Sequence, residues 1–247
     1  MPRRLTSPGG DWIHASTYNE RDPPGLSAMI RTEPIVLEGP AGRLEAAVTT
    51  PSDPVAKALL LHPHPLYQGT MNNKVVTTLA RAAGRLGALS LRFNFRGVGT
   101  SAGHYDGGRG EKDDARAAAS WLQARYPSLP LWIMGFSFGA ALAFDLAAEL
   151  RSVFLVTVAP PVAMITNPAA PPCPWLLIQG DADEVVDTKA VRAWAASISP
   201  PPNLISVPGA SHFFHGRLGE IIAAVVETAR HHGLGHAPPR SEGWSTV

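Results

Sequence analysis

The hydrophobic positions of this chain change their spacing along its length, and the changes divide it into alternating strands and helices. Short, nearly continuous apolar runs such as Lys57–Leu61 and Leu129–Met134 predict strands that are buried on both faces. In Lys74–Leu86 the apolar residues recur every three or four positions, which predicts a helix. The other predicted strands are Pro34–Leu37, Arg43–Thr49, Ala88–Phe93, Val153–Val158, Trp175–Ile178 and Leu204–Val207. The other predicted helices are Lys112–Tyr126, Phe138–Leu150, Lys189–Ile198 and Leu218–Arg230.

This alternation predicts an α/β fold, with one mostly parallel sheet and helices on both faces. The first two strands flank the turn Gly39–Gly42 and are expected to form an antiparallel hairpin. The intervals between elements leave no room for a second domain, so residues 29–232 are expected to form a single domain. The flanking segments lack apolar periodicity, and we expect residues 1–28 to be a disordered arm and residues 233–247 a flexible tail. Met29 opens the regular pattern, so a natural start at Met29 and a genuine disordered arm are both open.

Composition and charge exclude several classes of protein. The formal net charge is +1 and no basic stripe stands out, so we expect no nucleic-acid partner. Cys173 is the single cysteine, which excludes an intramolecular disulfide and a Cys-rich metal site. The chain has no uninterrupted apolar run of about 18 residues, so no membrane span is expected. The N-terminus lacks the apolar stretch of a secretory signal, and a cytoplasmic location is therefore expected. The pattern predicts no oligomeric state.

Gly135–Gly139 has the pattern G-x-S-x-G and is the strongest chemical signal in the chain. It follows a predicted strand and opens a predicted helix, which is the setting that a nucleophile elbow requires. The turn is tight, and a side chain at either flanking glycine would collide with the neighbouring strand or helix. We therefore predict that Ser137 is a nucleophile. The alternative is a serine that caps a buried helix, with the glycines needed only for close packing.

A nucleophilic serine needs a base, and the base needs an orienting carboxylate. Asp183 follows the strand Trp175–Ile178, and His212 follows the strand Leu204–Val207, so both are expected at the same sheet edge as the elbow. Each has rivals. The rival candidates for the acid are Asp181 and Glu184, whereas Asp187 could simply cap the next helix. For the base they are His62, His64 and His215, of which His215 is expected at the start of the final helix.

With these residues in place, the chain resembles the α/β-hydrolase superfamily, and in particular its small, capless, dienelactone-hydrolase-like bacterial members. The resemblance runs from about Pro34 to His232. It rests on five blocks in order, namely residues 62–67 (HPHPLY), 92–99 (RFNFRGVG), 135–139 (GFSFG), 180–186 (GDADEVV) and 209–214 (GASHFF). It implies an eight-stranded sheet without a cap domain, the acid at Asp183 in the pattern G-x-x-D, and the base at His212. It implies no cofactor and no metal.

An oxyanion hole needs two main-chain N–H groups. The first is expected from Phe138, the residue after the nucleophile. The second is expected from the loop that begins at His62, where Pro63 and Pro65 have no N–H to give. Leu66 is favoured over His64 as this donor. Many relatives carry His-Gly at this point, so the His-Pro-His-Pro stretch departs from the common pattern and leaves the donor open.

The predicted function is hydrolysis of short-chain carboxylic esters through an acyl-enzyme, with a small-molecule ester as the partner. The segment Ala159–Pro174 is short and rich in proline, so it can form a rim but hardly a lid. The expected pocket is open and apolar. Its candidate wall residues, some of which could belong to the core, are Leu66, Tyr67, Phe136, Phe138, Val162 and Phe213. Thioesters, lactones and peptides remain alternative substrates for the same three residues.

Two other classes of function stay open. A metal-dependent hydrolase could use His62 and His64 as ligands, with Asp183 and His212 added. A non-catalytic binding protein could use the same scaffold.

A charged, Gly-rich patch could bind an anionic substrate, but we favour a structural role in which Arg96 pairs with a carboxylate of the next helix. The patch consists of Arg96, Asp106, Glu111, Asp113 and Asp114. Nothing marks Cys173 as reactive.

Overall fold

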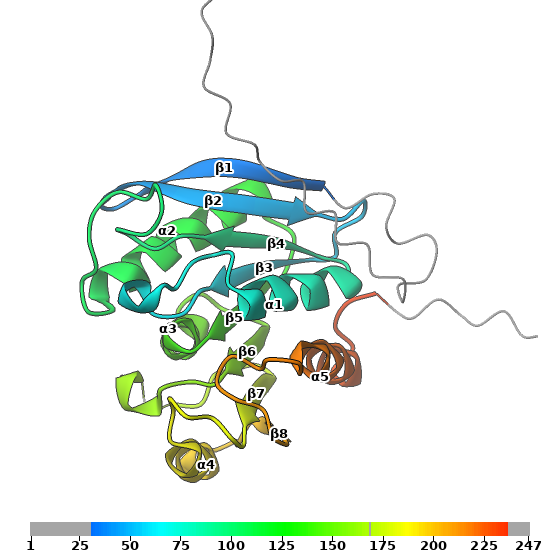
Figure 1. Ribbon diagram of the computed structural model, residues 1–247. Helices are drawn as coiled ribbons and strands as arrows, with labels where there is room; N and C mark the ends of the chain where they lie inside the picture. The colour runs from blue at the N-terminus through cyan, green and yellow to red at the C-terminus, as the bar shows by residue number, and fades with distance from the viewer. Residues whose placement is uncertain (1–30, 168, 237–247) are drawn as a thin grey trace, which may run out of the picture.

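The computed structural model describes residues 31–167 and 169–236. They form one eight-stranded sheet with the strand order β1-β2-β4-β3-β5-β6-β7-β8. The strands are β1 Arg31–Gly39, β2 Gly42–Thr50, β3 Ala56–Leu61, β4 Ala88–Phe93, β5 Leu131–Phe136, β6 Phe154–Val158, β7 Trp175–Gly180 and β8 Asn203–Val207. The predicted α/β fold with a mostly parallel sheet is confirmed. Figure 1 shows how strongly the sheet twists between β1 and β8.

The sheet is antiparallel only at one end. β2 runs antiparallel to both β1 and β4, and the hairpin closes where Gly39 lies opposite Gly42. All pairs from β4 to β8 are parallel, so the carboxyl ends of β3 to β8 meet at one edge. Loops that leave this edge are where an open α/β sheet places its ligands.

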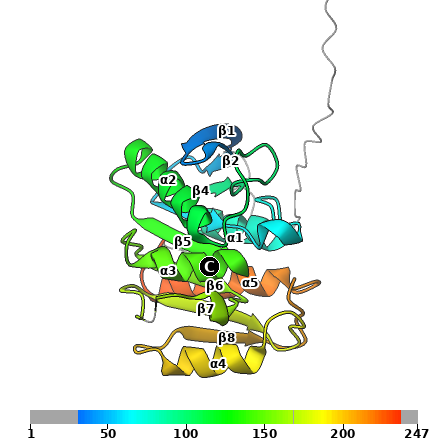
Figure 2. The same cartoon turned by 90° about the vertical axis from the view of Figure 1, so that its left-hand side faces the viewer.

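The described residues form five α-helices. Figures 1 and 2 show that these helices cover the two faces of the sheet. α1 Lys74–Arg85 and α5 Leu218–His231 pack on one face, where Trp132, Phe154 and Phe214 fill the core. α2 Arg109–Arg125, α3 Phe138–Ala147 and α4 Thr188–Ser197 pack on the other face, with Phe93, Phe95 and Phe144. The 3₁₀ helices of the described segments, η2 Pro65–Tyr67 and η3 Val162–Met164, lie in loops at the carboxyl edge.

The element boundaries differ from the predicted ones at a few places. α2 begins at Arg109, three residues before the predicted start at Lys112. The Glu111 carboxylate makes this earlier start possible, because it accepts the main-chain N–H groups of Asp106 (2.9 Å) and Gly108 (2.7 Å). β5 continues to Phe136 and therefore delivers the chain directly to Ser137.

The predicted arm, residues 1–28, lies outside the described residues, as do the alternative start at Met29 and residues 237–247 of the predicted tail. Residues 233–236 are described. The main-chain N–H of His236 donates to Leu86 O at 2.9 Å, and its Nε2 lies 3.1 Å from Asp53 O. Within residues 31–167 and 169–236, no helix has both the length and the apolar character needed to cross a membrane.

Candidate active site

Ser137 lies at the turn between β5 and α3, at the carboxyl edge of the sheet. Its φ of 53° and ψ of −122° are a conformation that residues other than glycine rarely adopt. The strained turn is held by its surroundings, because the Ser137 N–H donates to Val158 O at 2.8 Å and α3 starts at the next residue. The hydroxyl is thereby lifted above the sheet edge, as expected for a nucleophile elbow.

The two glycines of the elbow allow the close packing that the sequence predicted. A Cβ at Gly135 would fall on the main chain of Gly139, and a Cβ at Gly139 would fall on the carbonyl groups of Leu61 and His62. The start of α3 therefore rests directly on the end of β3. This contact places the first N–H groups of α3 beside the loop that follows β3.

His212 and Asp183 are brought together because their two loops are hydrogen-bonded to each other. The Ala182 N–H donates to Ala210 O at 3.2 Å, and the Gly209 N–H donates to the Asp181 carboxylate at 2.6 Å. Gly180 is required at the end of β7, since a Cβ there would fall on Ala210 O. The His212 ring packs on Phe136 and Phe213, each with its ring centre 5.1 Å away.

A chain of hydrogen bonds joins Ser137, His212 and Asp183. The Ser137 Oγ lies 3.1 Å from His212 Nε2, and His212 Nδ1 lies 2.9 Å from Asp183 Oδ2. The exposed fraction of the side chain is 3% for His212 and 0% for Asp183, so the carboxylate–imidazole pair is shielded from water. With the proton on Nδ1, the imidazole can accept the serine proton at Nε2.

The Asp183 carboxylate is fixed by four donors. Oδ1 accepts the main-chain N–H groups of Val185 (2.9 Å) and Val186 (2.8 Å), and Oδ2 accepts Gln179 Nε2 (2.9 Å) as well as His212 Nδ1. Burial acts to raise the pKa of Asp183, but the hydrogen bonds from His212, Val186 and Val185 outweigh it, and the pKa lies below its ordinary value. The group is therefore an anion at neutral pH.

The rival carboxylates have other partners. Asp181 accepts the Gly209 N–H, and Glu184 accepts the main-chain N–H of His212 at 3.2 Å. Asp187 caps α4 by accepting the N–H groups of Lys189 (2.8 Å) and Ala190 (3.2 Å). Asp183 alone among them is hydrogen-bonded to the His212 ring within the described part of the chain.

The rival histidines are likewise engaged elsewhere. His62 is fully buried, with Nδ1 2.6 Å from Pro63 O and Nε2 accepting the Phe95 N–H at 3.0 Å. Both ring nitrogens are thus used, which leaves none for a metal. His215 lies three residues before α5 and stacks on Phe213. Across residues 31–167 and 169–236, no group of three or more His, Cys, Asp or Glu side chains is placed to hold a metal ion.

Leu66 and His64, the two candidates for the second donor of the oxyanion hole, differ in whether their main-chain N–H already has an acceptor. The Leu66 N–H, favoured from the sequence, donates to His64 Nδ1 at 3.2 Å as part of the cap of η2. The main-chain N–H groups of His64 and Phe138 have no acceptor among the described residues. The His64 and Phe138 rings are 5.0 Å apart, so these two residues lie side by side.

The predicted wall residues divide into a rim and a core. Tyr67 (80% exposed), Leu66 (66%) and Phe213 (40%) lie on loops that follow β3 and β8 at the carboxyl edge. Val162 is partly buried in η3, after β6. Phe136 and Phe138 are fully buried and belong to the core, where Phe136 supports the His212 ring from below.

The charged patch is structural, as favoured from the sequence. Arg96 makes two side-chain hydrogen bonds to Asp114, Nε to Oδ2 at 3.0 Å and Nη2 to Oδ1 at 2.8 Å. Its main-chain N–H also donates to Oδ2 of Asp114, at 2.9 Å. Asp113 instead pairs with Arg116, and Asp106 with Arg109. The Arg96–Asp114 pair pins the loop after β4 onto α2.

Sequence reasoning missed Gln179 altogether, and it considered Glu184 only as a rival for the acid. Gln179 donates to the Asp183 carboxylate, and Glu184 accepts the main-chain N–H of His212. A signal for Gln179 was present, because it is a polar residue in an otherwise apolar buried strand. Glu184 is exposed and has no comparable signal.

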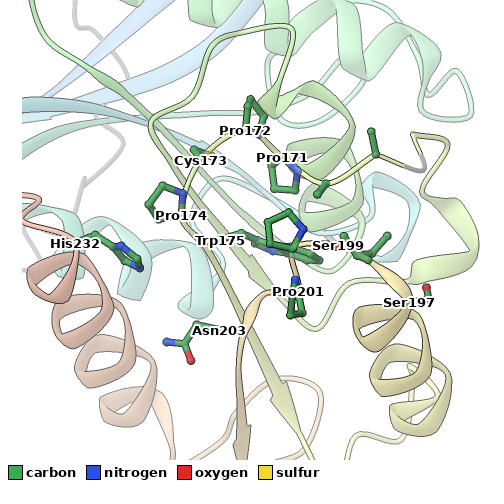
Figure 3. Close-up of a pocket in the computed structure, with 14 residues that line it drawn as sticks. Pro171, Pro172, Cys173, Pro174, Trp175, Ser197, Ser199, Pro201, Asn203 and His232 are labelled. Atoms are coloured by element: carbon green, nitrogen blue, oxygen red, sulfur yellow. The ribbon is translucent and has the colours of Figure 1, made fainter.

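A separate hollow opens at the amino edge of the sheet, where β7 and β8 begin, far from the loops that carry Ser137 and His212. Figure 3 shows its wall of prolines around Trp175, with Cys173 and His232 at its margin. Burial raises the pKa of the Cys173 thiol to about 11, so the thiol is protonated at neutral pH. This agrees with the expectation that Cys173 is not reactive.

The fold and the Ser137–His212–Asp183 arrangement define the class of α/β serine hydrolases. No family model matches the sequence. A serine hydrolase without a lid from Xanthomonas campestris is 42% identical, with 84% of this chain and 97% of that chain covered and a TM-score of 0.80. An α/β serine hydrolase homologue from Coxiella burnetii is 44% identical, with 79% and 96% covered and a TM-score of 0.76.

An uncharacterised protein of Rickettsia prowazekii is 39% identical over 206 residues, which is 77% of this chain and 86% of the relative. At these identities and coverages the likeness extends beyond the fold. The chain belongs to the α/β serine hydrolases without a lid. This membership confirms the resemblance that the five sequence blocks indicated.

Proposed function

We propose that the protein is a carboxylesterase that cleaves short-chain esters through an acyl-enzyme. Ser137 Oγ attacks the ester carbonyl while His212 Nε2 takes its proton. The imidazolium then gives that proton to the leaving alcohol, and Ser137 is left acylated. A water molecule attacks the acyl-enzyme with His212 again as the base, which releases the acid and restores Ser137. Asp183 holds the imidazole in the tautomer that leaves Nε2 free to accept.

The oxyanion of each tetrahedral intermediate is assigned to the main-chain N–H groups of Phe138 and His64. Phe138 is the first residue of α3, where the helix dipole also favours negative charge. His64 is preferred to Leu66 because the Leu66 N–H already donates to the His64 ring.

The observation that carries the proposal is the chain of hydrogen bonds from Ser137 through His212 to the buried Asp183, at 3.1 and 2.9 Å. It supports acyl transfer on ester substrates, and the same three residues could serve thioesters, lactones or peptides. The preference for short acyl groups rests on the exposed apolar rim of Leu66, Tyr67 and Phe213. The cytoplasmic location remains a prediction.

Hydrolysis of p-nitrophenyl butyrate by the wild type and by Ser137→Ala tests this function. We expect the wild type to turn over in the presence of a chelator, and the variant to lose roughly 10⁶-fold in kcat. Circular dichroism of Ser137→Ala serves as the control for folding. A folded variant that keeps more than a few per cent of the wild-type activity would remove Ser137 from the reaction.

A further inference from the structure

Gln179 is a buried polar residue that the proposed mechanism does not yet use. It is the last residue but one of β7 and is completely buried. Its Nε2 donates to Asp183 Oδ2 at 2.9 Å and to Gly180 O at 3.2 Å. The same carboxylate oxygen accepts His212 Nδ1 at 2.9 Å. Gln179 and His212 therefore share one acceptor.

The side-chain amide of Gln179 has one oxygen without a hydrogen-bond partner in the described part of the chain, which indicates that its nitrogen is the group needed at this position. Its Oε1 is buried and has no partner among the described residues, which destabilises the folded chain relative to an apolar side chain of the same shape. Turning the amide over would bring Oε1 within 2.9 Å of Asp183 Oδ2, with two acceptors face to face. The Asp183 anion thus selects the orientation in which the amide nitrogen faces it.

We propose that Gln179 is a positioning residue that tunes the Asp183–His212 pair, an inference that rests on the proposed function. A donor on Oδ2 shares the negative charge of that oxygen, so the carboxylate holds a proton on the imidazole less strongly. His212 must take a proton from Ser137 and return it to the leaving group in each cycle, and a base held too firmly in its charged form does this poorly.

The surroundings of the pair leave this role to Gln179. The other donors to the Asp183 carboxylate are the main-chain N–H groups of Val185 and Val186, which serve the opposite oxygen. The nearby titratable side chains have separate contacts. Among the carboxylates, Asp181 accepts the Gly209 N–H, Glu184 accepts the main-chain N–H of His212, and Asp187 caps α4. Among the histidines, the His215 ring stacks on Phe213 and the His64 ring packs against Phe138.

Gln179→Met tests the inference, because methionine keeps the length of the side chain and removes the amide donor. We expect kcat for p-nitrophenyl butyrate to fall roughly 10-fold with KM unchanged, since Gln179 does not face the substrate. We also expect the acid limb of the kcat/KM profile to move up by about half a pH unit or more. The matched control is Thr157→Val, which removes the buried Trp175 Nε1–Thr157 Oγ1 hydrogen bond (2.9 Å) away from the site.

Gln179→Glu provides a second variant if the first does not fold. Two carboxyl groups this close share a proton, so the protonated glutamic acid can donate to Asp183 Oδ2 in place of the amide. We expect activity closer to wild type at low pH and a loss as the shared proton dissociates. Equal kcat and acid limbs for Gln179→Met and Thr157→Val, or a Gln179→Glu profile parallel to that of the wild type, would overturn the inference.

A readout without turnover separates this inference from the proposed function. The imidazole of His212 can be titrated by NMR in the wild type and in Gln179→Met, with His212→Ala to assign its signal. A higher midpoint in Gln179→Met supports the role of Gln179 even if no ester is hydrolysed. An unchanged midpoint contradicts it even if the wild type is an active esterase.

Discussion

At the residue scale, His62 is a buried side chain that joins two loops of the site and has no role in the proposed chemistry. It lies directly after β3, with Nδ1 2.6 Å from Pro63 O and Nε2 accepting the main-chain N–H of Phe95. These bonds tie the loop after β3, which carries the candidate oxyanion donor, to the loop after β4. If His62 were protonated at Nε2, this nitrogen could no longer accept the Phe95 N–H, and two N–H groups would face each other.

Burial lowers the pKa of His62 to about 4, although the bond to Pro63 acts in the opposite direction. The unfolded chain, with a histidine pKa near 6.5, therefore binds more protons than the folded chain between about pH 6.5 and 4. The stabilisation from neutral His62 is complete above this window and is lost as the pH falls through it. We expect the loss of this stabilisation to lower the free energy of unfolding by about 2 kcal/mol between pH 7 and pH 5.

Urea unfolding at pH 7 and pH 5 measures this loss. His62→Gln should be less stable than the wild type at pH 7 but should lose about 2 kcal/mol less on acidification. His231→Gln, at an exposed position in α5, is the matched control and should follow the wild type. An identical pH dependence for His62→Gln and the wild type would show that His62 is not held neutral.

The choice of base is a second prediction at this scale. His212→Ala should lose roughly 10⁵-fold or more in kcat/KM, whereas His215→Ala should retain nearly all of it, because only His212 contacts Ser137. The wild-type kcat/KM should fall on acidification, because His212 can take the serine proton only while its Nε2 is unprotonated. Activity lost with His215→Ala and kept with His212→Ala would reverse the assignment.

Choices between neighbouring residues needed the resemblance or the structure, because the local pattern alone does not make them. Asp181 and Asp183 stand in one loop, and only the hydrogen bonds show that the first holds Gly209 and the second holds His212. The main-chain N–H of Leu66 is occupied by the side chain of His64, a local contact that no residue pattern reveals.

At the element scale, the elbow depends on the contact between the start of α3 and the end of β3. Gly139→Ala would place a methyl group on the main-chain carbonyls of Leu61 and His62, and main-chain atoms cannot turn aside as the end of a flexible side chain can. We expect the free energy of unfolding to fall by about 3 kcal/mol. Thermal or urea unfolding measures this directly.

Gly84→Ala in α1 is the matched control, because a Cβ there has no heavy atom within 4 Å. This change should stabilise the protein by about 0.5–1 kcal/mol through helix propensity and chain entropy. If Gly139→Ala were as stable as Gly84→Ala, α3 and β3 would not be in the contact described.

The elements themselves were largely predictable, because buried parallel strands and amphipathic helices have distinct hydrophobic periods. The strand Ala88–Phe93 has the predicted bounds, and each of the other strands overlaps its predicted range. The start of α2 was missed because Gly107, Gly108 and Gly110 disfavour a helix locally, and the buried Glu111 overrides that preference. The sheet order comes from long-range pairing, which the local pattern does not contain.

At the scale of the whole molecule, the absence of a lid limits the acyl chain that the site can bury. The segment between β6 and β7 contributes only η3 to the carboxyl edge within the described residues. Burial gains about 0.8 kcal/mol per CH₂ only while the chain remains in contact with an apolar wall. A long acyl tail would extend into water and gain little.

We therefore expect kcat/KM across p-nitrophenyl esters to peak between about C2 and C6, with no activation at a lipid–water interface. A series from C2 to C16, measured below the micellar concentration of each ester, checks this. A maximum at C12 or longer would reveal a deep acyl tunnel that is incompatible with the open rim.

The most direct test of the central claim is covalent labelling of the intact protein with a fluorophosphonate, followed by peptide mass spectrometry. A serine activated by His212 and Asp183 should react once per chain, at Ser137, and the label should disappear in Ser137→Ala and in heat-denatured wild type. A folded wild-type protein that takes up no label, or that is labelled equally in Ser137→Ala, would contradict the assignment of Ser137 as the nucleophile.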